Sequence, residues 1–348
     1  DPRTDRILVE GTDNVLSGFE IRGEFSVAAI IVRQGAANNQ FGPGIVFAGM
    51  PQGVGIVFEN RGTVANKVIG SWCGITGDGS QVDPLADDCI RFHSGASASI
   101  VGGATPQERN VLVASSRGVG VSVEGLATRD ITIQGNHIGI GPDGSTAVGN
   151  EAGVRVVDGA SGVHILGNII AGNRNTGIAV FGESRGIRIE ENRIGLGSTG
   201  TACVANTGPG ISLQGGVTDA GIARNVIHCN SDGGILLRDG TVQAVTITQN
   251  SLSRNQGKPI VLAEGANLGI QPPTLEPKAD GSVEGRACPG CTVELFSDPS
   301  GEAEVYEGTI TADAVDGTFV FNKDAFAYRA LRGTSTDAGN TSALCPPA

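Results

Sequence analysis

Aromatic residues are scarce in this sequence, at 4% of 348 residues, and charged residues are few, at 17%. So low a charge argues against wholesale disorder. No apolar run reaches the ~18 residues that a transmembrane helix needs, so we expect no membrane span. Acidic residues outnumber basic ones, and the net charge of −12 makes nucleic acid and anionic membranes poor partners.

Long helices are also excluded. The chain contains 55 glycines and 15 prolines, and each glycine inside a helix costs about 1 kcal/mol relative to alanine. The abundant glycine therefore favours short strands joined by tight turns.

Seven cysteines favour an oxidising compartment, so we expect a protein that is secreted, extracellular or on the cell surface. The odd count leaves one thiol over, and Cys345 is the candidate for a free or intermolecular cysteine. Cys288 and Cys291 lie three positions apart, and three interpretations of this pair stay open: a tight disulfide, a redox pair or half of a metal site. We expect six cysteines to be paired, in a connectivity that the sequence leaves open: Cys73, Cys89, Cys203, Cys229, Cys288 and Cys291.

One phrase recurs along the chain: two apolar residues two positions apart, then an asparagine three positions later, then another apolar pair. Ile131 and Ile133, for example, lead to Asn136. The steps between successive asparagines are 26, 32, 24, 33 and 25 residues. The asparagines that carry the repeat are Asn110, Asn136, Asn168, Asn192, Asn225 and Asn250.

Each repeat unit contains three short alternating strands joined by Gly, Asn and Asp turns. A unit of about 24 residues cannot bury its own apolar face, whereas stacked coils can. The sequence therefore predicts an all-β parallel solenoid of about ten coils. We expect the repeated asparagines to lie at one corner and to form a ladder of amide hydrogen bonds between coils.

The segments 102–112 (GGATPQERNVL) and 136–139 (NHIG) resemble the repeat phrases of bacterial secreted right-handed parallel β-helix repeat proteins. This resemblance covers about residues 1–270 and implies a right-handed parallel β-helix. The segments 288–296 and 334–342 resemble the immunoglobulin-like β-sandwich that often follows such helices. The resemblance implies a fold and names no function.

We therefore expect two domains, a β-helix over residues 1–270 and a small immunoglobulin-like β-sandwich over residues 271–348. The boundary falls near the proline pair at 272–273, after which short alternating strands follow. Residues 7–9 already have the pattern of a strand, so we expect the first coil to lack a cap. Such an open strand edge is a template for pairing with another chain.

Two outward-facing pairs suit acid–base chemistry on a glycan. His164 and Arg188 fall on one outward row of neighbouring coils, about 4.8 Å apart. Arg91 and His93 share the outward face of another strand. A solvated surface ladder is the other interpretation of both pairs. The scarcity of aromatic residues argues against a long sugar-binding groove, because sugar sites favour aromatic faces.

Four aspartates lie close together in the sequence between the first two cysteines: Asp78, Asp83, Asp87 and Asp88. Flexible loops rich in carboxylate oxygens suit calcium. Aspartate is also an ordinary loop residue, so a calcium site and a plain solvated loop both stay open. We expect no other cofactor.

Two functions are compatible with these observations. The first is a non-enzymatic extracellular structural or adhesive protein that self-associates into filaments or a surface layer through its uncapped coil end and its tail. The second is a secreted polysaccharide lyase or glycoside hydrolase acting on an acidic glycan, such as a cell-surface polysaccharide. The small number of candidate catalytic residues favours the first function, and analogy with other β-helices favours the second.

Overall fold

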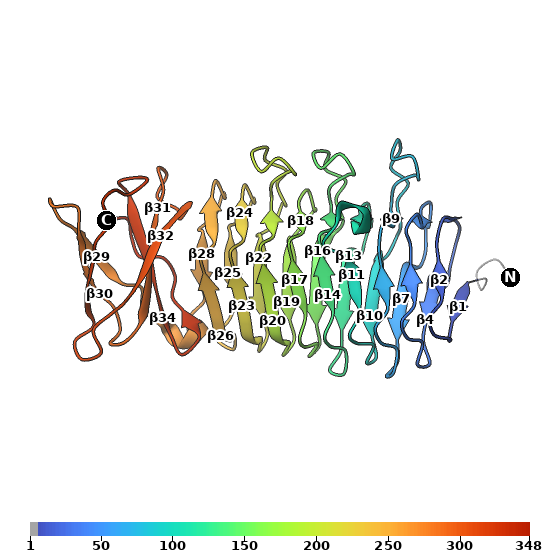
Figure 1. The fold of residues 1–348 in the computed structure, drawn as a ribbon, viewed down its shortest axis with the longest axis horizontal. Coiled ribbons are helices and arrows are strands. Elements are labelled where there is room, and N and C mark those ends of the chain that lie inside the picture. Colours follow the sequence, from blue (N-terminus) through green and yellow to red (C-terminus); the bar gives the residue numbers. More distant parts are fainter. Residues whose placement is uncertain (1–5) are drawn as a thin grey trace.

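A computed structural model describes residues 6–348. The chain forms a long stack of coils with a small antiparallel region at one end (Figure 1). Three parallel sheets, here called A, B and C, run the length of the stack, and each coil contributes one strand to each sheet in turn. The fold is the predicted right-handed parallel β-helix, with nine complete coils and a tenth strand in sheet A.

The strands of each sheet pair in chain order. Sheet A consists of β1 (Ile7–Val9), β4 (Ala28–Val32), β7 (Val54–Glu59), β10 (Ile90–His93), β13 (Val119–Glu124), β16 (Ala152–Val157), β19 (Ile178–Phe181), β22 (Ile211–Gln214), β25 (Ile235–Leu237) and β28 (Ile260–Leu262). Sheet B consists of β2 (Val15–Leu16), β5 (Gln40–Phe41), β8 (Lys67–Val68), β11 (Ile100–Gly102), β14 (Thr132–Gln134), β17 (His164–Leu166), β20 (Arg185–Glu190), β23 (Thr218–Ala223) and β26 (Gln243–Thr248). Sheet C consists of β3 (Glu20–Ile21), β6 (Val46–Phe47), β9 (Trp72–Cys73), β12 (Val111–Leu112), β15 (His137–Ile138), β18 (Ile169–Ile170), β21 (Arg193–Ile194), β24 (Val226–His228) and β27 (Ser251–Ser253).

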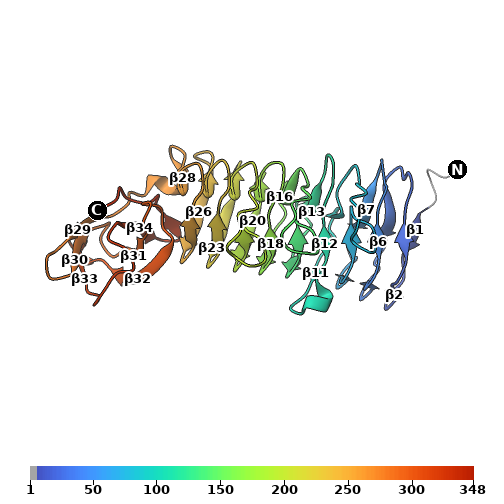
Figure 2. The same ribbon diagram turned by 90° about the horizontal axis from the view of Figure 1, so that it is seen from above.

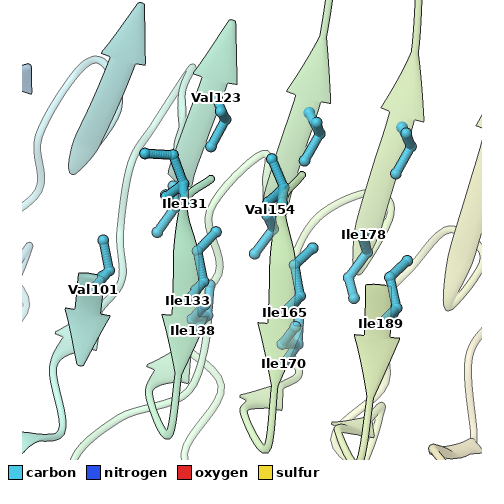
Figure 3. Packing of buried hydrophobic residues seen from close by; sticks show 14 of the residues in the cluster. Val101, Val123, Ile131, Ile133, Ile138, Val154, Ile165, Ile170, Ile178 and Ile189 are labelled. Carbon is cyan, nitrogen blue, oxygen red and sulfur yellow. The ribbon is translucent and has the colours of Figure 1, made fainter. Parts of the chain in front are cut away.

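Aliphatic side chains fill the inside of the stack. The inward position of sheet B is occupied by Val101, Ile133, Ile165 and Ile189 in four successive coils, and all four are fully buried. Figure 3 shows these residues aligned from coil to coil. Because strand side chains alternate between faces, the residues between them point outward and are free to carry chemistry.

The repeated asparagines stand at the corner between sheets B and C, where each bonds the next coil. Asn168 donates its side-chain N–H to Asn192 Oδ1 at 3.0 Å, and Asn192 does the same to Asn225 at 3.0 Å. Each amide also donates to a buried backbone carbonyl, as Asn192 does to Ile165 at 2.8 Å. The ladder satisfies backbone groups that the tight corner leaves without strand partners.

Two further ladders stand at the other corners, and sequence reasoning did not find them. One joins sheets C and A through Asn150, Asn173, Asn206, Asn230 and Asn255. The other joins sheets A and B in the first coils through Asn14, Asn39 and Asn66. Side-chain amides therefore join successive coils at all three corners, and at the corner between sheets A and B they do so in the first coils.

The antiparallel region after residue 273 contains two small sheets. One sheet consists of β29 (Thr274–Pro277), β30 (Val283–Arg286) and β33 (Thr318–Phe321), and the other of β32 (Val305–Thr311), β31 (Thr292–Ser297), β34 (Leu331–Asp337) and β35 (Asn340–Thr341). This tail covers the last coil: the Ala244 N–H donates to Asn340 Oδ1 at 2.8 Å, and Glu294 accepts bonds from Thr248 and Gln249.

Two short 3-10 turns complete the described chain, η1 (Pro106–Glu108) and η2 (Ala266–Gly269). The η1 turn projects from the side of the stack (Figure 2). No helix in residues 6–348 is long and apolar enough to cross a membrane.

Candidate functional site

Arg91 belongs to a charge network on the outer face of sheet A. Its Nε donates to Asp88 Oδ2 at 2.8 Å, and Asp88 is 1% exposed. Arg155 lies two coils further on and reaches both Asp88, at 3.5 Å, and Glu124, at 3.1 Å. Burial raises the pKa of Glu124, but the Ser122 hydroxyl and the two guanidiniums outweigh it and hold that pKa below its usual range. Two cations and two carboxylates neutralise one another here.

His93 lies two residues after Arg91 in the same strand, and its side chain points to the same face. Its Nδ1 is 2.7 Å from the Ser94 hydroxyl, and its Nε2 is 3.6 Å from Glu59. The structure therefore places Arg91 and His93 on one outward face, and each of them is already paired with a carboxylate.

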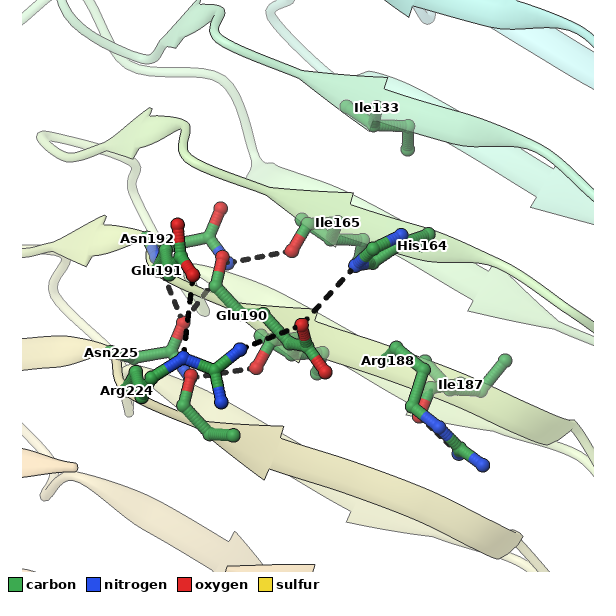
Figure 4. A network of polar contacts seen from close by, with 12 residues as sticks. Ile133, His164, Ile165, Ile187, Arg188, Glu190, Glu191, Asn192, Arg224 and Asn225 are labelled. Atoms are coloured by element: carbon green, nitrogen blue, oxygen red, sulfur yellow. Dashed lines mark hydrogen bonds and ion pairs between the residues drawn. The ribbon is translucent and has the colours of Figure 1, made fainter. Parts of the chain in front are cut away.

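His164 and Arg188 are register partners on sheet B, but their side chains diverge. His164 Nε2 lies 3.6 Å from Glu190 (Figure 4). Arg188 pairs instead with Asp219, at 2.9 Å. Arg224 bridges Glu190, at 3.0 Å, to Glu191. The structure does not bring His164 and Arg188 together as a working pair. Instead, the polar contacts of His164 continue from Glu190 through Arg224 to Glu191, at the corner between sheets B and C.

The four aspartates that suggested calcium are dispersed. Asp78 accepts hydrogen bonds from the hydroxyls and backbone of its own turn, which lower its pKa to about 2. Asp83 pairs with Arg22, Asp87 accepts a backbone N–H from the preceding coil, and Asp88 belongs to the sheet A network. Within residues 6–348, no three carboxylate, imidazole or thiol side chains gather in a way that would hold a metal ion.

The six cysteines expected to be paired form three disulfides, Cys73–Cys89, Cys203–Cys229 and Cys288–Cys291. Cys345 is unpaired and buried, and burial raises the pKa of its thiol. The first two disulfides tie down chain segments beside sheet C.

A cavity of about 290 Å³ opens at the corner between sheets B and C. We call it the corner pocket. Its lining comes from three parts of the chain: the loop around η1, the glycines of the corner, and the outward residues of sheet C. The residues that line it are Gly103, Ala104, Thr105, Pro106, Arg109, Gly135, His137, Gly167, Asn168, Ile169, Glu191 and Arg193.

Two guanidiniums in the pocket wall have no acidic partner. Arg109 donates to the Gly135 carbonyl at 3.4 Å, and Arg193 donates to the Ser198 carbonyl. Among the ion pairs of residues 6–348, none involves either side chain. The one carboxylate in the lining, Glu191, pairs with Arg224. In a chain of net charge −12, two unpaired cations in one cavity favour an anionic ligand.

His137 lies beside them and is 2% exposed. Its Nδ1 is 3.1 Å from the Gly141 carbonyl, which can only accept, so Nδ1 carries the proton. Burial lowers the pKa of His137, the bond to Gly141 opposes this, and the charge of Arg109 lowers it further. The imidazole is therefore neutral, and its buried Nε2 is an acceptor with no hydrogen-bond partner.

Three hairpins rise beside sheet C, at 75–82, 140–147 and 196–203, and are seen along one edge of the stack in Figure 1. Each tip folds over the outward residue of its own coil. A Cβ on Gly144 would lie 3.3 Å from the His137 ring, and a Cβ on Gly200 would lie 3.6 Å from Arg193. Successive hairpins touch, since the Ser198 N–H donates to the Gly144 carbonyl at 2.8 Å. They form a row over the outward residues of sheet C, beside the corner pocket.

Sequence reasoning missed the corner pocket, although one signal pointed to it. The outward row of sheet C is the residue directly after each ladder asparagine. In six coils that residue is Val111, His137, Ile169, Arg193, Val226 and Ser251. A histidine and an arginine in an otherwise apolar or small row mark the coils that line the cavity.

Solved structures of low similarity match much of the chain. The periplasmic alginate epimerase AlgG is 14% identical over 72% of this chain and 69% of its own, with a TM-score of 0.44. The A-module of the mannuronan C-5 epimerase AlgE6 from Azotobacter vinelandii is 15% identical over 76% and 77%, with a TM-score of 0.44. The enzymatically active domain of tailspike protein 2 from bacteriophage CBA120 is 10% identical over 96% and 68%, with a TM-score of 0.34. No curated protein gives a significant sequence match.

These matches correct one expectation. The non-enzymatic structural or adhesive function was wrong as the main interpretation, because two of these matched structures are epimerases of alginate or mannuronan and the third is an enzymatically active tailspike domain. Neither the fold nor the comparisons supports self-assembly into filaments or a surface layer. At these identities and TM-scores the likeness assigns no substrate and no catalytic residue to this chain.

A family model described as periplasmic copper-binding protein (NosD) matches residues 74–270, more than half of the chain. The match covers the coils that carry the corner pocket, the hairpins and two of the three asparagine ladders. Together with the three disulfides, it fits a periplasmic or extracellular location. The chain belongs to the NosD family of parallel β-helix proteins.

Proposed function

We propose that this protein is a carbohydrate-active enzyme that binds an acidic glycan at the corner pocket. One observation carries the proposal: Arg109 and Arg193, two cations without acidic partners, line one cavity beside the neutral imidazole of His137. Guanidinium groups recognise carboxylates in planar, two-point fashion. A uronate unit supplies such a carboxylate together with hydroxyls that can donate to an unpartnered nitrogen.

The residue types favour elimination over hydrolysis. Hydrolysis needs two carboxyl groups flanking the bond, and the lining of the pocket contains one, Glu191, which is held by Arg224. Elimination needs a cation to neutralise the uronate carboxylate and a base to take the proton from the adjacent carbon. Arg109 and Arg193 fit the first role. His137 Nε2 has the protonation state for the second role, but it is buried under the 140–147 hairpin, so this role requires that hairpin to move aside when the glycan binds.

In that reaction the proton passes from the carbon to Nε2, and a carbon–carbon double bond forms. The glycosidic carbon–oxygen bond breaks with its electron pair on the leaving oxygen, which takes a proton from water. If that bond stays intact, Nε2 keeps the proton and a water on the opposite face delivers another to the carbon, which inverts the carbon instead; the hydroxide left behind is neutralised by the proton on Nε2. Both outcomes begin with the same base and the same cations.

Copper, which the family description names, does not fit the described residues. Soft ligands suit copper, but six cysteines are in disulfides, and the single methionine, Met50, is fully buried in the core. The histidines are on different strands, and no metal-type cluster forms within residues 6–348. We assign no role to copper in the proposed reaction.

The experiment is a screen of uronate polymers and a neutral glucan, read by the ultraviolet absorbance of an unsaturated uronate and by NMR for inversion. We expect turnover on an acidic polymer only. Arg193→Ala and Arg109→Ala should lose binding, and His137→Gln should bind without turnover. Arg185→Ala is the matched control, because Arg185 is an exposed arginine of sheet B outside the pocket. Failure to bind any acidic glycan, or equal loss in Arg185→Ala, would refute the proposal.

A further inference from the structure

The loop around η1 is the only large departure from the regular corner between sheets B and C in the coils that line the pocket. In the next coil that corner is a glycine and an asparagine, Gly135–Asn136. In the η1 coil, residues 104–109 are inserted between the equivalent glycine, Gly103, and Asn110. The insertion projects outward at this corner (Figure 2). We call residues 104–109 the knob.

The knob is held rigidly. Thr105 and Glu108 form a capping box, in which the Thr105 N–H and hydroxyl both donate to Glu108 at 3.1 and 2.8 Å. Pro106 fixes the first turn. The Gly70 N–H donates to the Glu108 carbonyl at 3.1 Å, and a Cβ on Gly70 would lie 2.8 Å from the Gln107 carbonyl. The knob therefore packs against the preceding coil and forms a rigid barrier.

The corner pocket lies on the other side of this barrier. Ala104, Thr105 and Pro106 form its wall toward the N-terminal coils, and Arg109 is the last residue of the knob. On the sheet C side the lining consists of outward residues such as His137 and Arg193, which the hairpins at 140–147 and 196–203 contact. The cavity is therefore closed along the helix axis toward the N-terminus, where the knob forms its wall.

A polymer running along the axis cannot continue past the knob. The volume of about 290 Å³ is at the lower end of pockets that hold small ligands. We propose that the corner pocket takes the end of an acidic glycan chain, and that the knob is the element that excludes the interior of the chain. This inference rests on the proposed function and adds to it how the chain is engaged.

The two kinds of binding differ in their dependence on chain length. If interior units bind, the affinity per molecule rises in proportion to the number of units, because each added unit gives the chain one more position in which it can bind. If only an end binds, the affinity per molecule becomes constant once the pocket is filled. Calorimetric titration of the full chain with oligouronates of defined length separates these cases.

We expect the affinity to stop rising at two or three units. Deleting residues 104–108, which keeps Arg109, should restore an affinity that rises with length and shift products from short oligosaccharides toward internal cleavage. The wild-type titration stands by itself if that variant fails to fold. Affinity that keeps rising with length in the wild type would overturn the chain-end inference and leave the proposed function intact. No binding at any length would overturn both.

Discussion

Replacing Asn192 tests how the corner that carries the pocket is held. Its side-chain N–H groups donate to the Ile165 carbonyl at 2.8 Å, the Glu190 carbonyl at 2.9 Å and Asn225 Oδ1 at 3.0 Å. Its Oδ1 accepts from the Asn168 backbone and side-chain N–H groups at 2.9 and 3.0 Å. Asn192 itself is 1% exposed, so water cannot replace these partners.

Asn192→Ala removes all five bonds. At about 0.5–1.5 kcal/mol for each, the expected loss is about 3–7 kcal/mol, a large part of the ~5–15 kcal/mol by which native proteins are stable. Asn192→Asp keeps the shape but places a carboxylate against three acceptors, so its loss should be at least as large at neutral pH. Lowering the pH should relieve part of that loss, because a protonated aspartate can donate one bond.

The assay is urea unfolding followed by circular dichroism, with hydrogen exchange to locate the opening. Asn175→Ala is the control, since Asn175 is an exposed asparagine outside the ladders, and its change should stay within about 0.5 kcal/mol. Exchange should increase first in the strands of sheets B and C on either side of residue 192. A loss below about 1 kcal/mol for Asn192→Ala would refute the reasoning.

Three further predictions concern other parts of the chain. Burial lowers the pKa of His228 from 6.5 to about 4, so the unfolded chain binds more protons between these values; stability should fall by up to about 3 kcal/mol as the pH drops from 6.5 to 4, and His228→Gln should flatten that dependence in urea titrations. Burial raises the pKa of Glu294 at the junction of tail and last coil. The contribution of Glu294 to stability is therefore present at low pH and is lost as the pH rises through the folded pKa. Glu294→Gln should remove this pH dependence from the hydrogen-exchange rates of β35. Replacing Cys203 and Cys229 by serine opens a loop of 26 residues and should cost about 3 kcal/mol, with faster exchange confined to the 196–203 hairpin; unchanged exchange there would count against the role of the disulfide.

The repeat in the sequence was sufficient to predict the coils, because the apolar alternation and the asparagine spacing are local. Ile131, Ile133 and Asn136 follow one another within six positions, and the stacking of such phrases leaves few alternatives. The outward register of His164 and Arg188 was also predictable, since both occupy the same position of the phrase.

The corner pocket could not be predicted in the same way. Arg188 turns to Asp219 rather than to His164, a choice between neighbours that alternation does not decide. The pocket needs the knob and the outward row of sheet C together. The longer asparagine steps of 32 and 33 residues mark the coils that carry the two later hairpins, but the knob occurs once and has no period. The sequence shows that residues 104–109 are extra, and only the three-dimensional arrangement shows what they enclose.

The most direct test of the central claim is a crystal structure of the protein with an acidic oligosaccharide. The account predicts a uronate carboxylate within hydrogen-bond distance of the Arg109 and Arg193 guanidiniums, with the sugar beside His137 and its chain leading away from the knob. A sugar bound instead on sheet A beside Arg91 and His93, with the corner pocket empty, would contradict it.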